Sequence, residues 1–101
     1  MRMMMLALSA VLLAAAPASA ADPAQGRQLA QQWCANCHVI GGAETGRDTA
    51  PALPAIAHRY GQDQNWLRTW LTAPHPPMPD LHLSRQEIDD IVAYLSSLPS
   101  R

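Results

Sequence analysis

Two cysteines and a histidine stand close together in Cys34-Ala35-Asn36-Cys37-His38. This is the C-x-x-C-H pattern, which is typical of covalent haem attachment. The two thiols are about one helical turn apart, so they can form thioethers to the two vinyl groups of one porphyrin. The next residue then lies beneath the ring centre, where its imidazole can bind iron. The sequence therefore predicts one haem c, bound through Cys34 and Cys37, with His38 as the proximal iron ligand.

The same cysteines allow three other interpretations. A dithiol oxidoreductase of the thioredoxin type places its C-x-x-C after a strand, whereas the residues before Cys34 are expected to be helical. A disulfide between residues three apart closes a trivial loop and stabilises little. Zinc needs about four ligands, and His75 and His82 lack the usual H-x₃₋₅-H spacing. Only haem attachment uses all three residues of the motif.

A second axial ligand is expected from a proline-rich loop. Beyond residue 20 the chain holds one methionine, Met78, within Pro74-His75-Pro76-Pro77-Met78-Pro79-Asp80. Four prolines exclude helix and sheet pairing and favour an extended, stiff segment. A thioether is a weak ligand that a stiff loop can hold in place, so Met78 is the expected distal ligand. The competing ligands are His58, His75 and His82.

The elements that would position these residues are predicted to be helices joined by loops rich in proline and glycine. Asp22 and Pro23 begin a helix expected to reach about Trp33, with Gln25 completing its capping box. A short helix is expected at 54–59, and a third at 64–72 with Asp63 as its cap. Residues 39–51 are expected to form a loop.

The last helix is the best defined element. Ser84-Arg85-Gln86-Glu87 has the sequence of a capping box. Asp89 and Asp90 lie off the apolar face and are expected to be solvated. That face carries Ile88, Ile91, Val92, Leu95 and Leu98. No segment alternates for long enough to predict a strand, so the expected fold class is all-α, with three to four helices around one haem.

Length and charge limit the possible classes of protein. The chain has 101 residues, and its seven arginines and eight acidic residues, without any lysine, give a net charge of -1. This excludes the basic surface of a nucleic-acid-binding protein. A domain this small is marginally stable, and two cysteines cannot supply a disulfide framework. The haem is expected to supply the missing stability.

Residues 1–20 have the layout of a cleaved secretory signal peptide. Arg2 supplies the positive charge, an apolar run follows, and Ala18-Ser19-Ala20 is an A-x-A cleavage site. The apolar run is shorter than the ~20 residues of a spanning helix, so no transmembrane anchor is expected. Residues 21–101 are then a single periplasmic domain, expected to be a monomer.

With C-x-x-C-H, a methionine in a proline loop and a capped terminal helix, residues 21–101 resemble a small bacterial class I cytochrome c. The resemblance implies a one-electron carrier that cycles between Fe(III) and Fe(II), rather than an enzyme. Its partners would be redox proteins: a dehydrogenase or reductase as donor, and an oxidase or other acceptor. Two alternatives stay open: a gas or peroxide sensor or enzyme with a labile distal site, and a haem subunit of a larger complex.

The resemblance also assigns roles to single residues. Gly26 is expected to pack against Tyr94 on the last helix, and the carbonyl of Pro51 is expected to accept the N–H of His38. The family often has an aromatic residue four positions before the first cysteine. Here that position is Ala30, and Trp33 is expected to supply the bulk instead. Trp66 and Trp70 share one helical face and are expected to be core, with a contact from Trp66 to the haem or its propionate as the alternative.

Overall fold

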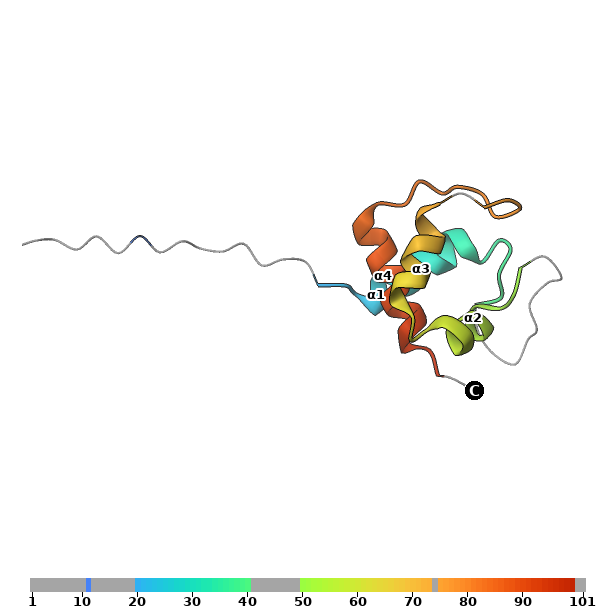
Figure 1. Cartoon of the computed structure of the whole chain (residues 1–101), viewed down its shortest axis with the longest axis horizontal. Helices are drawn as coiled ribbons and strands as arrows, with labels where there is room; N and C mark the ends of the chain where they lie inside the picture. Colours follow the sequence, from blue (N-terminus) through green and yellow to red (C-terminus); the bar gives the residue numbers. More distant parts are fainter. Residues whose placement is uncertain (1–10, 12–19, 41–49, 74, 100–101) are drawn as a thin grey trace, which may run out of the picture.

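The computed structural model describes residue 11 and the ranges 20–40, 50–73 and 75–99. The predicted signal peptide lies outside these residues, except for Val11 and Ala20, and so does most of the predicted loop at 39–51. The elements are α1 (Pro23–Leu29), the π-helical turn η1 (Ala30–Cys34), α2 (Leu53–Tyr60), α3 (Gln64–Thr72) and α4 (Arg85–Ser97). The described ranges contain helices and no strand, which confirms the all-α class (Figure 1).

Helix α4 is the element against which α1, α2 and α3 all pack. Its capping box forms as predicted, because Ser84 Oγ accepts the Glu87 N–H at 3.1 Å and the Glu87 carboxylate accepts the Ser84 N–H at 2.9 Å. The predicted apolar face is buried except for Leu98, which is half-buried. Its buried members in the core are Ile88, Ile91, Val92 and Leu95.

Helix α1 crosses α4 at very short range, and Gly26 makes this approach feasible. A Cβ atom on Gly26 would collide with the carbonyl of Asp90 and lie 2.9 Å from Tyr94 Cβ. The expected packing of Gly26 against Tyr94 is therefore confirmed. The expectation for Trp33 is wrong, because its side chain is 46% exposed. Ala30, which is fully buried, takes the inner position of η1.

The start of α1 is capped from two sides. Asp22 accepts the Ala24 N–H at 2.9 Å, as predicted, but the Asp22 N–H donates to Asp90 Oδ1 at 2.8 Å rather than to Gln25. Asp90 also accepts from Gln86 Nε2 at 2.9 Å and is 4% exposed, so the expectation that it is solvated is wrong. The close helix crossing explains the difference, because it brings this carboxylate within reach of the α1 N-terminus.

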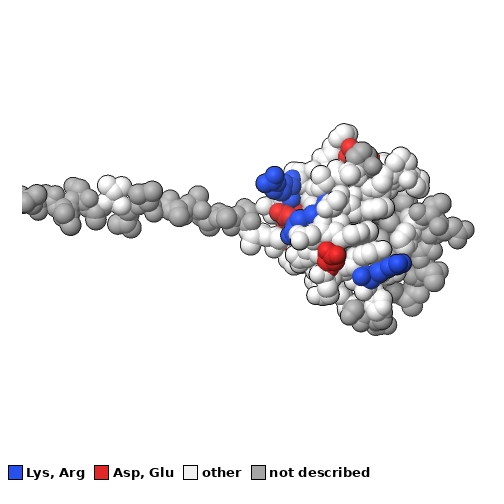
Figure 2. Space-filling model, in the orientation of Figure 1, with Lys and Arg blue, Asp and Glu red and all other residues white. Residues whose placement is uncertain are grey.

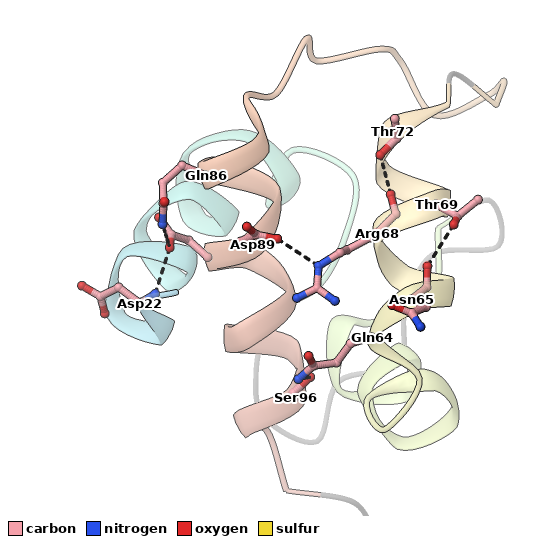
Figure 3. A network of polar contacts seen from close by, with 10 residues as sticks. Asp22, Gln64, Asn65, Arg68, Thr69, Thr72, Gln86, Asp89 and Ser96 are labelled. Atoms are coloured by element: carbon pink, nitrogen blue, oxygen red, sulfur yellow. Dashed lines mark hydrogen bonds and ion pairs between the residues drawn. The ribbon is translucent and has the colours of Figure 1, made fainter. Parts of the chain in front are cut away.

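Helix α3 has the predicted bounds, and polar contacts join it to α4. Asp63 caps it by accepting the Trp66 N–H at 3.0 Å. Arg68 Nε donates to Asp89 Oδ1 at 2.9 Å, so Asp89 is paired rather than simply solvated (Figure 3). Both side chains remain about one-third exposed, and such a pair contributes about 0–1 kcal/mol.

Removing the Asp90 carboxylate is expected to destabilise the haem-containing protein. Asp90→Ala should lower the free energy of unfolding by about 2 kcal/mol, because two hydrogen bonds to a buried charged acceptor are lost. Denaturant unfolding measures the change. Asp90→Asn, which keeps one acceptor oxygen, should lose less, and Asp89→Ala is the matched surface control. Equal stability of Asp90→Ala and the natural protein would contradict the capping role.

Candidate haem site

The two cysteines lie at the end of η1 and in the turn that follows it. The Cys34 carbonyl accepts the N–H groups of Cys37, at 3.1 Å, and His38, at 2.8 Å, so the chain bends tightly around it. Cys34 is 8% exposed, whereas Cys37 is exposed to solvent. Burial raises the pKa of the free Cys34 thiol, which keeps it protonated at neutral pH. Cys34, Cys37 and His38 therefore lie together in one tight turn.

The imidazole of His38 is oriented by a backbone carbonyl. Its Nδ1 lies 2.6 Å from the Pro51 oxygen. A carbonyl can only accept, so Nδ1 carries a proton, and in the neutral imidazole Nε2 presents the lone pair. Beside this contact, the Leu53 N–H donates a backbone hydrogen bond to the Val39 oxygen at 2.8 Å. This bond holds the segment after His38 against the segment after Pro51. This is the tautomer that an iron-binding histidine requires.

The loop that carries Met78 is a tight turn, and the prediction of an extended segment is wrong. The Met78 N–H donates to the His75 carbonyl at 3.1 Å, which closes the turn. Prolines fit turns as well as extended segments, because both have similar φ angles. Pro74 lies outside the described residues. The turn fixes the backbone position of Met78.

His75 is part of this turn, and its imidazole contacts the Met78 side chain. Its Nδ1 lies 2.7 Å from the Ala73 oxygen, and its Nε2 lies 3.2 Å from Met78 Sδ. The ring is half-buried. The other two candidate histidines, His58 and His82, are exposed.

Four rings form a column that ends at the methionine turn. Tyr60 stacks on Trp66 with centroids 3.7 Å apart, and Trp66 stacks on Trp70 at 5.3 Å. Trp70 then meets the His75 ring at 3.7 Å, tilted by 42°. The core assignment is wrong for Trp70, which is 46% exposed. It agrees with Trp66, which is half-buried and packs against the core cluster. The i, i+4 spacing of the two tryptophans is the sequence signal for this stacking.

These residues fit a covalently attached haem. The chain offers two thiols within four residues, an imidazole whose Nε2 is free to bind, and a thioether in a fixed turn. Residues 23–99 match the sequence model of the Cytochrome c family. The chain belongs to the cytochrome c family. It carries a covalently bound haem c, and its fold is the small all-α cytochrome c fold.

A named relative agrees with this family. The chain is 40% identical over 90 residues to "Cytochrome c-552" of Bradyrhizobium diazoefficiens. The aligned region covers 88% of this chain and 86% of that protein. No solved structure gives a significant match. The family match and this relative identify the cytochrome as a haem electron carrier that exchanges electrons with redox partners.

Charged side chains are dispersed on the face of this cytochrome that Figure 2 shows. Figure 2 shows acidic and basic side chains scattered over one face among uncharged ones, and the described residues of that face form no patch of one sign. Among the described helices, none has the length and apolar character needed to cross a membrane.

Proposed function

We propose that this cytochrome carries single electrons in the periplasm, with His38 and Met78 as the axial ligands of its haem iron. The contact between His38 Nδ1 and the Pro51 carbonyl carries the proposal, because it fixes the tautomer and direction of an iron-binding imidazole. Pro51 is then a positioning residue for His38. Trp66, which stands in the ring column, remains a candidate for a haem contact.

The haem, when bound, supplies a one-electron Fe(III)/Fe(II) couple. The chain would hold the iron through His38 and Met78 and keep water away from it. A thioether from Met78 and an apolar surrounding both favour Fe(II), which raises the potential. If His38 and Met78 both held the iron, no open position would remain for a substrate, which favours electron transfer over catalysis.

The partners are proposed to be a dehydrogenase or reductase as donor and an oxidase or other acceptor. Contacts between such proteins are small and short-lived. The scattered charges of the face in Figure 2 support docking that does not depend on one strongly charged partner surface. We expect the cytochrome to act as a monomer in this role.

Export is proposed to remove residues 1–20, because the positive start, apolar run and A-x-A site follow the secretory pattern. Mass spectrometry of the protein matured in a periplasm tests this. The expected mass is that of residues 21–101 plus one haem. A haem-bearing protein that retains residues 1–20 would contradict the cleavage.

Electrochemistry and ligand binding together test the carrier function. A reversible one-electron wave is expected, and the reduced protein at neutral pH should not bind carbon monoxide, because Met78 occupies the distal position. Rapid binding of carbon monoxide would contradict the carrier and favour the sensor or enzyme with a labile distal site. A haem-free Cys34→Ala/Cys37→Ala sample provides the blank for the electrochemical wave.

A further inference from the structure

Two donor atoms of different chemistry meet in the turn that carries Met78. His75 Nε2 lies 3.2 Å from Met78 Sδ, and the backbone bond from the Met78 N–H to the His75 carbonyl holds the two residues together. Imidazole nitrogen and thioether sulfur are both axial ligands of haem iron. An iron that binds the sulfur would therefore have the nitrogen close beside it.

The His75 ring is held so that the nitrogen facing the sulfur is the one able to bind metal. Nδ1 faces the Ala73 carbonyl at 2.7 Å, which can only accept, so Nδ1 carries a proton, and in the neutral imidazole Nε2 then holds the lone pair. The Trp70 indole packs against the ring at a centroid distance of 3.7 Å. A half-buried ring fixed on two sides loses little further freedom on binding.

The other two candidate histidines have no such placement. His58 is exposed on α2. His82 has a side chain that is 87% exposed and lies 3.8 Å from an Asp80 oxygen. Neither is stacked on Trp70, and among the described contacts only His75 reaches the Met78 sulfur. These residues provide matched controls of the same chemistry.

We propose that His75 is a second distal ligand, which binds the iron through Nε2 when the Met78 sulfur is lost. The proposal rests on the His38/Met78 ligation given above. Loss of the methionine would then leave a six-coordinate iron with two histidine ligands rather than an open site. The potential should fall, because imidazole favours Fe(II) less than a thioether does. The turn would thus keep small molecules from the iron in both states.

Spectra of the haem-loaded Met78→Ala variant test the proposal. The expected result is a low-spin haem without the weak iron–sulfur charge-transfer band, with a lower potential and no binding of carbon monoxide. Adding His75→Ala should give a high-spin haem that binds carbon monoxide. Adding His58→Ala or His82→Ala to Met78→Ala should leave the low-spin spectrum unchanged. Free imidazole should return the Met78→Ala/His75→Ala variant to low spin, which shows that its haem site is still folded.

Two results would overturn the role of His75 while leaving the Met78 ligation intact. They are a high-spin Met78→Ala variant, and a low-spin spectrum that persists in Met78→Ala/His75→Ala. In either case the natural protein would still show the iron–sulfur band. Absence of that band from the natural protein would overturn the Met78 ligation and, with it, the proposal that depends on it.

Discussion

Replacing both Cys34 and Cys37 with alanine is expected to leave the chain largely unfolded. A domain of about 80 residues buries only a little over ~60% of its unfolded surface, so its core alone gives marginal stability. The haem adds a large apolar body, two covalent links and two axial bonds. Cys34 itself belongs to the core cluster, so its sulfur connects the haem to the packed helices.

Far-ultraviolet circular dichroism of the purified double variant at neutral pH measures this effect. The helical signal of the haem-containing protein should be almost entirely lost. The control is Cys37→Ala, which removes the exposed sulfur and keeps one thioether, and it should remain folded. Native-like helicity in the haem-free double variant would show that the helices pack without the cofactor, contrary to the expectation.

Gly26→Ala is expected to cause the largest loss of stability from a single small substitution. The added Cβ would collide with the backbone carbonyl of Asp90, which cannot rotate away as a side chain could. Helix α1 would have to move off α4 and weaken the hydrogen bond from Asp22 to Asp90. Overpacking of this kind costs about 3 kcal/mol, which exceeds the ~1 kcal/mol that alanine gains over glycine in a helix.

Denaturant unfolding of haem-loaded Gly26→Ala provides the test, with Gln25→Ala as control. Gln25 is the exposed neighbour on the same helix, so its replacement should change the unfolding free energy by less than about 0.5 kcal/mol. If Gly26→Ala were as stable as the natural protein, the close crossing of α1 and α4 would not exist in solution.

The parts of the fold that follow from sequence are those set by neighbours in the chain. The caps at Asp63 and Ser84 join residues three apart, so the sequence contains both partners of each hydrogen bond. The bounds of α3 follow from the same local signals. The C-x-x-C-H motif is equally local, because five consecutive residues contain both thiols and the imidazole, and it therefore indicates the family directly.

The features that sequence reasoning missed depend on residues far apart in the chain. Asp90 lies off the apolar face of α4, so periodicity predicts that it is solvated. Its partner is the Asp22 N–H, 68 positions away, and no helical pattern contains that contact. The place of His75 likewise depends on how its turn packs against Trp70 of α3. The prediction for Trp33 fails because the π-helical turn puts Ala30 inside instead.

The most direct test of haem attachment and Met78 ligation is the absorption spectrum, oxidised and reduced, of the protein matured in a periplasm competent for haem c attachment. We predict a low-spin haem c with the weak iron–sulfur charge-transfer band in the oxidised form. Low-spin haem without that band would contradict Met78 as the ligand and indicate a histidine. High-spin haem would indicate an open site, and a protein without haem would contradict the central claim.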